Sequence, residues 1–341
     1  MTFSIRKTLM RAAAASLALA AFSSVAASAA DKVTLGAIRF TSHAASFVAY
    51  ERGYFKEQGL DVELKFFQAA QPMAVAIASG DVDFGVTAIS GGLMGLADKG
   101  VVKVIGGALH EEKGIDGQII LVSNKAYDEG VTDPSKLKGR TFGITQAGSS
   151  FHYMAAKIAD AEGFTLEDMK VKPLQKVGAI IGALKSGQID AWAIQPHIAK
   201  ALINAGAAKK IGMVADFIPD YQVTTVFTST KVAEENPDLV KRFLAAFSKG
   251  AADFNAALVD KTEGEEGQIA MAKLIHKYVY ADQPFEKASV SIINGAMRLN
   301  PNARLDMGSV KDQLAWFKAE HLAPESLTLE KLVNTNYVET Y

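Results

Sequence analysis

The feature that most constrains the fold of this sequence is an internal repeat, in which six residues recur 107 positions further along the chain. The pairs are Thr34 and Thr141, Gly36 and Gly143, Gln68 and Gln175, Ser79 and Ser186, Gly80 and Gly187, and Asp83 and Asp190. Around both sets, the pattern of apolar and turn-forming residues predicts the order strand, helix, strand, helix, strand, which is typical of a parallel α/β unit. Because a period this long does not fit a solenoid, the repeat predicts two similar α/β lobes.

The predicted elements of the two copies correspond one to one. The first copy is expected to contain strands at 33–38, 61–67 and 82–88 and helices at 44–55 and 71–78. The second copy is expected to contain strands at 141–144, 169–174 and 189–194 and helices at 151–163 and 178–187. In such units the ligand loops lie at the carboxyl ends of the parallel strands, so both lobes are expected to present loops to a shared cleft.

Two further strands are expected to connect the lobes. Residues 119–125 carry the chain into the second lobe and residues 221–230 bring it back, which predicts a two-strand hinge of the kind that closes around a ligand. From Asn236 onward the spacing of apolar residues predicts helices that pack on the first lobe. The expected division is lobe 1 at 30–122, lobe 2 at 123–221, and a return to lobe 1 with C-terminal helices at 222–341.

The N-terminal residues 1–29 have the pattern of a cleaved secretory signal peptide. Its parts are the basic residues Arg6, Lys7 and Arg11, a short apolar run at 12–22, and the small-residue cleavage site Ala27-Ser28-Ala29. The apolar run is too short and too rich in alanine to span a membrane comfortably. No later segment approaches 18 uninterrupted apolar residues. The sequence therefore predicts a periplasmic protein with no membrane span after the leader is removed.

Composition excludes several classes of protein. The chain has no cysteine, which excludes disulfides, thiol catalysis, Cys-ligated zinc and iron–sulfur clusters. Its 36 Lys and Arg and 37 Asp and Glu residues give a net charge of -1, so no basic excess suggests nucleic-acid binding. The sequence contains no nucleophile elbow, phosphate-binding loop or dinucleotide fingerprint, and its histidines lack the spacing of a metal site. We therefore expect a protein that is not an enzyme and that needs no cofactor or metal.

Six segments carry a family likeness. They are AYERGYFKEQGLDVEL (49–64), ASGDVDFGV (78–86), LKGRTFGI (137–144), AGSSFHYM (147–154), LKSGQIDAWAI (184–194) and ENPDLVKRFLAAF (235–247). In this order the sequence resembles the periplasmic solute-binding proteins of ABC importers, in the SsuA/THI5-like (NMT1-like) group. The resemblance implies an α/β, two-lobed periplasmic binding protein fold (type II-like), with two parallel-sheet lobes joined by a two-strand hinge. It also implies a monomer that delivers a small-molecule solute to an ABC permease driven by a cytoplasmic ATPase.

The resemblance leaves the solute open. Members of the group are associated with nitrate, taurine, alkanesulfonates, aromatic acids and pyrimidine precursors of thiamine. Sulfonate- and taurine-type members often carry Trp, then Asp or Glu, then Pro at the position where this chain has Gln195-Pro196-His197. We expect a small organic anion, either a sulfonate, a taurine-like compound or an aromatic carboxylate or sulfonate. The alternatives are a binder of a thiamine pyrimidine precursor, and a secreted enzyme or chemosensory adaptor on the same fold.

The candidate ligand-binding residues lie in loops that follow the predicted strands. The loop at 147–150 precedes a helix, and the free N–H groups and dipole of a helix start suit an anion, although serine there could serve only as a helix cap. Arg39 could pair with a two-oxygen anion or lie on the surface. The full set of candidates is Arg39, Thr41, Ser42, His43, Gln68, Thr87, Ser90, Gln146, Gly148, Ser149, Ser150, His152, Gln195 and His197.

Aromatic residues near these loops have two interpretations. Phe40, Phe67 and Phe151 could sandwich an aromatic ring of the ligand or pack in the core. Trp192 falls in a buried strand, where core packing is favoured over stacking on a ligand.

Overall fold

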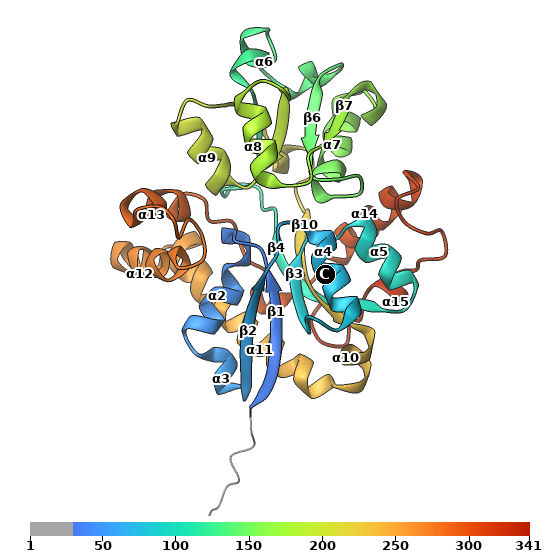
Figure 1. Ribbon diagram of the computed structural model, residues 1–341, viewed down its shortest axis with the longest axis vertical. Coiled ribbons are helices and arrows are strands. Elements are labelled where there is room, and N and C mark those ends of the chain that lie inside the picture. The colour runs from blue at the N-terminus through green and yellow to red at the C-terminus, as the bar shows by residue number, and fades with distance from the viewer. Residues whose placement is uncertain (1–29) are drawn as a thin grey trace, which may run out of the picture.

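The computed structural model describes residues 30–341, which form two α/β lobes, one above the other in Figure 1. Lobe 1 contains strands β1 (Asp31–Ala37), β2 (Leu60–Phe66), β3 (Phe84–Thr87), β4 (Val102–His110) and β10 (Gln222–Ser229). Lobe 2 contains strands β5 (Ile119–Val122), β6 (Thr141–Ile144), β7 (Lys170–Pro173), β8 (Ala191–Ile194) and β9 (Lys209–Met213). The sheet orders are β2-β1-β3-β10-β4 and β7-β6-β8-β5-β9, so each strand has a counterpart at the same place in the other sheet. The prediction of two similar α/β lobes is therefore confirmed.

The sequence repeat is visible in the hydrogen bonds that hold the two sheets. In lobe 1 the Thr34 N–H donates to the Asp83 carboxylate over 2.7 Å. In lobe 2 the Thr141 N–H donates to the Asp190 carboxylate, also over 2.7 Å. The bonds join β1 to the aspartate just before β3, and β6 to the aspartate just before β8. The repeated residues thus build the same frame of hydrogen-bonded strands in both lobes.

One strand of each sheet belongs to the connection between the lobes, and it runs antiparallel to its neighbours. β5 pairs with β8 and β9, and β10 pairs with β3 and β4, in each case antiparallel. The sheets are therefore mixed, and the parallel arrangement is found between β2, β1 and β3 and between β7, β6 and β8. A connecting strand enters its sheet at the carboxyl end of the parallel strands, and it therefore runs in the opposite direction to them.

The helices cover the faces of the two sheets. Lobe 1 has α2 (Ala44–Glu51), α3 (Tyr54–Glu57), α4 (Ala70–Ser79) and α5 (Gly91–Asp98), and lobe 2 has α6 (Asn124–Asp128), α7 (Ser150–Ala161), α8 (Val177–Lys185) and α9 (Pro196–Asn204). The single helix predicted at 44–55 is wrong, because Gly53 adopts φ 75° and divides it into α2 and α3.

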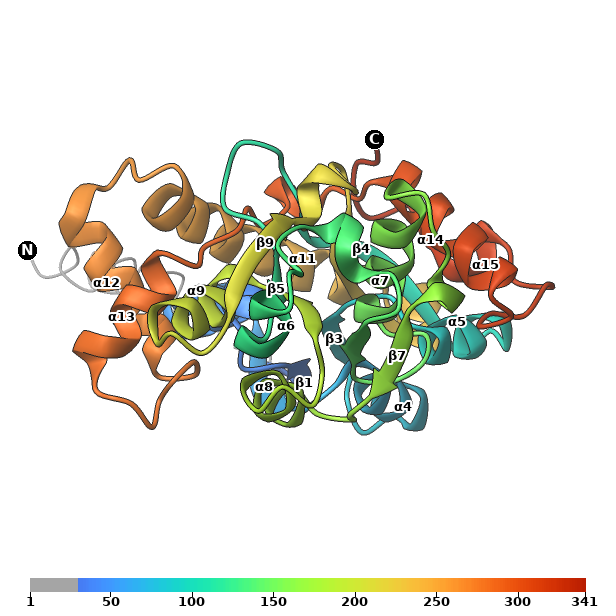
Figure 2. The same cartoon turned by 90° about the horizontal axis from the view of Figure 1, so that it is seen from above.

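The C-terminal part of the chain returns to lobe 1 and then reaches lobe 2 as well. Its helices are α10 (Thr230–Glu235), α11 (Pro237–Phe254), α12 (Gly264–His276), α13 (Phe285–Ile293), α14 (Met307–Ala319) and α15 (Leu329–Leu332). α11 packs closely on α2, since a Cβ on Gly250 would lie 2.4 Å from the Ala45 carbonyl oxygen. α13 and α14 contact α9 and α7 of lobe 2, so the tail, which packs on lobe 1 through α11, also reaches lobe 2. Figure 2 shows these two parts of the tail toward opposite ends of the molecule.

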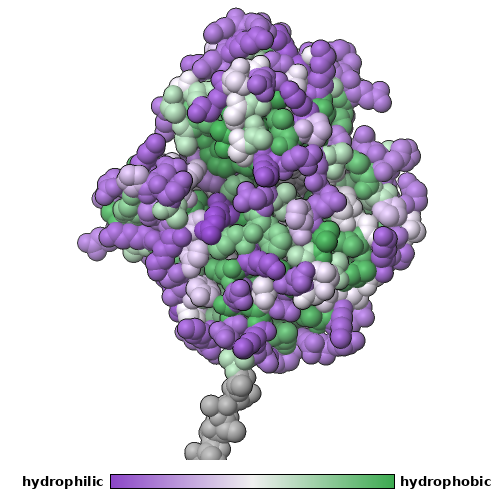
Figure 3. All heavy atoms as spheres, in the orientation of Figure 1, coloured by the Kyte–Doolittle hydropathy of each residue, from purple (hydrophilic) through white to green (hydrophobic). Residues whose placement is uncertain are grey.

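The surface follows the usual distribution of polar and apolar side chains. In Figure 3 hydrophilic residues cover most of the periphery, and apolar residues show as patches on this face of both lobes. Trp192 is fully buried in β8, which agrees with the interpretation of this residue as core. Within residues 30–341, no helix combines the length and the apolar character needed to cross a membrane. The predicted signal peptide, residues 1–29, lies outside the described residues.

Candidate functional site

A small cavity lies between the lobes, at the carboxyl ends of the parallel strands. Its walls come from the loops that follow β1, β2, β3, β6, β7 and β8, and from the two segments that cross between the lobes. The cavity has a volume of about 60 Å³. The polar and aromatic residues that line it are Phe40, His43, Gln68, Thr87, Gln118, Thr145, Ser149, Ser150, Phe151, Gln195 and Thr224.

The two lobes touch each other on both sides of this cavity. On one side the Gly91 N–H of lobe 1 donates to the Gly148 carbonyl oxygen of lobe 2 over 3.0 Å. On the other side the Thr41 hydroxyl lies 3.0 Å from Nδ1 of His197. These contacts join the lobes directly, so the structure is the closed arrangement.

Four helices begin at the cavity. α4 and α7 begin with Ala70 and Ser150, which line it, α8 begins with Val177, which also lines it, and α9 follows the lining residue Gln195. The first N–H groups of a helix have no partner inside the helix, and the helix dipole places partial positive charge there. No Asp, Glu, Lys or Arg is found among the residues that line the cavity. The arrangement therefore suits an anionic group held by neutral donors.

Four polar side chains that line the cavity have unsatisfied atoms in the described structure. They are Ser149 (Oγ), Thr224 (Oγ1), Gln118 (Nε2) and Gln195 (Oε1), all buried and without a hydrogen-bond partner. A buried polar group without a partner costs about 1–3 kcal/mol. A ligand that supplies partners to these groups would recover part of that free energy, which gives the cavity a preference for a polar ligand.

His43 is the titratable group that lines the cavity. Its side chain is 1% exposed, and burial lowers its pKa to about 3, so the imidazole is neutral at physiological pH. Nδ1 accepts the Ile38 N–H over 3.3 Å, which leaves the proton on Nε2. His43 can therefore donate one hydrogen bond, but it brings no positive charge to the site.

The two crossing segments are anchored by different buried side chains. Glu111 is fully buried and accepts the Gln118 N–H over 3.1 Å, and burial raises the pKa of its carboxyl to about 7. The Gln222 side-chain amide donates to the carbonyl oxygens of Leu109 and Thr224 over 3.0 and 2.8 Å. Each anchor thus holds the backbone of a cavity residue, Gln118 or Thr224.

The structure brings six of the predicted ligand-binding residues to the cavity wall. They are His43, Gln68, Thr87, Ser149, Ser150 and Gln195. It places the other eight outside the wall, and these are Arg39, Thr41, Ser42, Ser90, Gln146, Gly148, His152 and His197.

Several of these eight have other partners. The Arg39 guanidinium lies 3.7 Å from the centre of the Phe66 ring and donates to the Tyr278 carbonyl oxygen over 3.2 Å. The Ser90 hydroxyl caps α5 by accepting the Leu93 N–H over 3.3 Å. Arg39 is therefore occupied away from the cavity, and Ser90 serves as the N-cap of α5.

The β6–α7 loop uses its remaining candidates to shape the backbone. Nδ1 of His152 accepts the Gly148 N–H over 3.2 Å, and its ring meets Trp316 of the tail edge-on at 5.4 Å. Gly148 adopts φ 70°, a conformation that favours glycine. The Gln146 side chain donates to Gln71 of lobe 1. These residues position the loop and join the lobes.

Sequence reasoning missed Gln118 and Thr224. Thr224 lies in the hinge strand predicted at 221–230, and Gln118 lies one residue before the one predicted at 119–125, but neither strand was assigned a place in the site. Polar residues at the cleft ends of the crossing strands were the signal that could have identified them.

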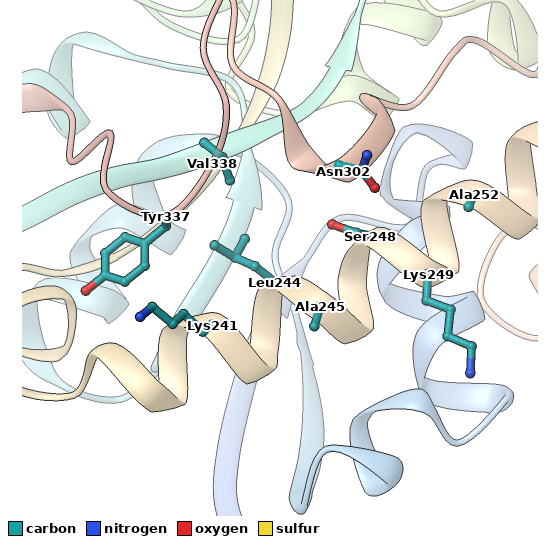
Figure 4. Close-up of a pocket in the computed structure, with 9 residues that line it drawn as sticks. All are labelled: Lys241, Leu244, Ala245, Ser248, Lys249, Ala252, Asn302, Tyr337 and Val338. Carbon is teal, nitrogen blue, oxygen red and sulfur yellow. The ribbon is translucent and has the colours of Figure 1, made fainter.

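A larger groove of about 470 Å³ lies on the outside of lobe 1, between α11 and the segments around Asn302 and Tyr337 (Figure 4). Lys241 and Lys249 extend away from its centre in Figure 4, and the Lys249 amine lies 2.7 Å from a Glu57 carboxylate oxygen. Every residue that lines it belongs to the tail, so closure of the lobes cannot enclose a ligand there. The described residues contain no group of three potential metal ligands.

Comparison with known proteins identifies the family. A sequence model described as NMT1/THI5 like matches residues 40–257. A protein of Brucella abortus (strain 2308), named as a binding protein, is 27% identical over 212 residues, which are 62% of this chain and 62% of that protein. A protein of Bacillus subtilis (strain 168), named for binding aliphatic sulfonates, is 28% identical over 207 residues, 59% of either chain. The chain thus matches somewhat less than two thirds of the length of these relatives.

A solved structure shows the same fold over a longer stretch. The alkanesulfonate-binding protein SsuA from Xanthomonas axonopodis pv. citri, bound to MOPS, superposes with a TM-score of 0.70. The superposition covers 89% of this chain and 98% of that chain at 17% identity. At this identity the likeness concerns the fold, and it agrees with the two-lobed arrangement described above. Because the family model covers most of the chain from lobe 1 through lobe 2 and into α11, this protein belongs to the NMT1/THI5 like family.

Proposed function

We propose that this protein is the periplasmic solute-binding component of an ABC importer, which captures a small organic anion by lobe closure and delivers it to the membrane permease. The observation that carries the proposal is the cavity itself, which is enclosed by both lobes, faced by four helix starts and free of charged side chains. Neutral donors and helix dipoles hold an anion without a fixed counter-charge, so the ligand can leave when the lobes separate.

The solute class that fits best is a sulfonate, a taurine-like compound or an aromatic carboxylate or sulfonate. The Ser149 hydroxyl and the first N–H groups of α7 offer donors to two or three oxygens of one anionic group. The unsatisfied Gln195 Oε1 offers an acceptor, which favours a solute that also carries a donor. The names of the Bacillus and Xanthomonas proteins support this class.

A second candidate is an aminopyrimidine precursor of thiamine. The rings of Phe40 and Phe151 line the cavity, and His43 and Gln195 provide neutral hydrogen-bonding groups. A neutral heterocycle would use the rings and these two residues, whereas a sulfonate would use the start of α7. The two candidates therefore depend on different walls of one cavity.

A thermal-shift screen of residues 30–341 tests the proposal. The panel contains taurine, alkanesulfonates, aromatic carboxylates and sulfonates, nitrate and aminopyrimidines. A ligand at 100 times its dissociation constant adds about 2.7 kcal/mol to the free energy of unfolding, which raises the melting temperature measurably. A rise with sulfonates or taurine supports the first candidate, and a rise with aminopyrimidines alone supports the second. No rise with any compound, together with turnover of a panel member, would reject both in favour of an enzyme.

A further inference from the structure

His197 is buried in the contact between the lobes, beside the cavity but outside its wall. The imidazole is 1% exposed, and Nδ1 lies 3.0 Å from the Thr41 hydroxyl, which is itself 2% exposed. The Phe40 ring packs against it with the ring centres 5.5 Å apart. The Tyr280 hydroxyl donates to the His197 carbonyl oxygen over 3.2 Å. A Cβ on Gly295 would lie 2.4 Å from the His197 Cα, so the backbone at Gly295 packs directly against the backbone at His197.

The groups that bury His197 come from outside lobe 2. Phe40 and Thr41 precede α2 in lobe 1, and Tyr280 and Gly295 flank α13 in the C-terminal tail. His197 itself lies in the first turn of α9 in lobe 2. Separation of the lobes would withdraw Phe40 and Thr41 from the imidazole and admit water. The burial of His197 is thus a property of the closed arrangement.

Within residues 30–341, the surroundings of His197 provide no carboxylate that would offset the charge of a protonated imidazole. Burial, with a smaller contribution from the nearby His43, lowers its pKa to about 3. The facing Tyr280 is neutral, because burial raises the pKa of its phenol. One turn along α9, the Lys200 amine is already paired with Asp116 over 2.6 Å and bonded to the Asn294 carbonyl oxygen. In the described part of the chain, no carboxylate makes an ion pair or hydrogen bond with His197.

We propose that the contact between His197 and Thr41 is a latch that holds the lobes closed, and that protonation of His197 opens it. Since neither residue lines the cavity, His197 is a positioning residue and not a ligand contact. The proposal rests on the proposed function only in that closure is what retains the solute. The other buried histidine, His43, accepts the Ile38 N–H of its own lobe, so its nearest partner does not change when the lobes separate.

The size of the effect follows from proton linkage. In the open form a hydrated His197 would titrate near its ordinary value of about 6.5. Protons then bind the open form and not the closed form. Lowering the pH from 7.5 to 5.0 is expected to reduce the ratio of closed to open protein about 30-fold through this one group.

Distance measurements between two spin labels test the latch without any ligand. The chain has no cysteine, so labels attach only to introduced ones. Val75→Cys on α4 and Ala179→Cys on α8 place one label on each lobe at exposed positions. Pulsed electron resonance then gives the fractions of short and long distances at pH 7.5 and 5.0.

Three variants in this labelled background separate the latch from general effects. Thr41→Val removes the hydroxyl but keeps the shape, so it is expected to lower the closed fraction at pH 7.5. His197→Gln keeps a polar side chain that does not titrate, so its closed fraction is expected to fall much less on acidification than that of the unaltered protein; a residual fall is the share of His43, which burial also keeps neutral. His321→Asn alters an exposed histidine far along the chain, and it is expected to respond to pH as the unaltered protein does. His197→Asn replaces His197→Gln if the latter does not fold, as judged by circular dichroism.

Two results would overturn the latch. One is a distance distribution that stays open, or stays closed, at both pH values in the otherwise unaltered protein. The other is a His197→Gln variant that opens on acidification as much as the unaltered protein does. Taurine and ethanesulfonate added at pH 5.0, where the latch is expected to be open, report on the proposed function separately, because a bound solute would close the lobes again. If pH moves the labels and these compounds do not, the latch stands and the proposed solute class is wrong.

Discussion

The two lobes share a frame and differ where they meet the cavity. In both, an aspartate at the start of the third strand accepts the N–H of the first strand over 2.7 Å. In both, a glycine in the first strand leaves room for a neighbour, since a Cβ on Gly36 would lie 2.9 Å from Met73 and one on Gly143 would lie 2.5 Å from Ile189. The repeat therefore preserves the contacts that hold strands together.

The cavity ends of the same elements differ. His43 in lobe 1 occupies the position of Ser150 in lobe 2, where the start of α7 lies. Gln68 lines the cavity, whereas its counterpart Gln175 is exposed and adopts φ 66°. Residues that hold the sheet are thus the same in both lobes, and residues that face the ligand are not. Two lobes built on the same frame thus present different side chains to the cavity.

The largest test of this comparison concerns Trp192 and its counterpart Gly85. Trp192→Ala empties a fully buried site in β8, so the free energy of unfolding is expected to fall by about 3–5 kcal/mol. Gly85→Ala places a Cβ 2.7 Å from the Phe227 ring, and the fall is expected to be about 1–3 kcal/mol from overpacking. Urea denaturation followed by circular dichroism measures both. Equal losses would mean that Trp192 and Gly85 contribute equally to the stability of the protein, although one fills the core and the other leaves room for a neighbour.

The second test concerns the carboxyl of Glu111, which holds one crossing segment where an amide, that of Gln222, holds the other. Burial raises the pKa of Glu111 from 4.5 to about 7, so the folded protein binds this proton more tightly than the unfolded chain does. Its contribution therefore favours folding at low pH and is lost as the pH rises from 4.5 through about 7, by about 3 kcal/mol in total. Glu111→Gln is expected to gain stability relative to the unaltered protein over that range.

The neighbouring Glu112→Gln is the matched control, because Glu112 is partly exposed and paired with Arg298 over 2.7 Å. Thermal unfolding at half-unit steps between pH 4.5 and 8 follows both variants. If the Glu111→Gln protein keeps the same slope as the control, the buried carboxyl does not titrate in this range.

The sequence predicted the frame because the frame is local and repeated. Asp83 and Asp190 each bond within their own lobe. The turns that follow α4 and α8 each use a glycine with positive φ, Gly80 and Gly187. The order of elements and the two crossings followed from the same signal. What the repeat could not supply was the direction of each crossing strand in its sheet, since that depends on which end the chain enters.

The site was predicted only in part, because its remaining features depend on closure. Gln118 and Thr224 enter the wall from crossing segments. Thr41 and His197 are 156 residues apart and meet only when the lobes touch. Arg39 has the charge that an anion site suggests, but the Phe66 ring beside it holds the guanidinium elsewhere. Contacts between residues so far apart in the chain produce no recognisable spacing pattern in the sequence.

The third test breaks the shared frame at its two equivalent aspartates. Asp83→Asn and Asp190→Asn each replace a carboxylate that accepts a strand N–H with a neutral amide. Hydrogen bonds to charged groups contribute about 1.5–3 kcal/mol, so each variant is expected to lose up to that amount. The losses should agree within about 0.5 kcal/mol if the two lobes use the bond in the same way. Urea denaturation measures the pair, and a loss at only one position would show that the equivalence is geometric without being energetic.

The smallest test separates a serine that faces the cavity from one that only caps a helix. Ser149 and Ser90 are both buried residues preceding a helix, but the Ser149 hydroxyl has no partner and the Ser90 hydroxyl accepts the Leu93 N–H. Ser149→Ala is expected to weaken binding of the most stabilising panel compound about tenfold, which is about 1.4 kcal/mol, with little change in stability. Ser90→Ala is expected to lower the free energy of unfolding by about 1 kcal/mol and to leave binding unchanged. Isothermal titration calorimetry and thermal unfolding on both variants distinguish the roles. If Ser149→Ala binds the compound as the unaltered protein does, the anionic group does not lie at the start of α7, and the wall formed by Phe40, His43 and Gln195 becomes the place to look for the ligand.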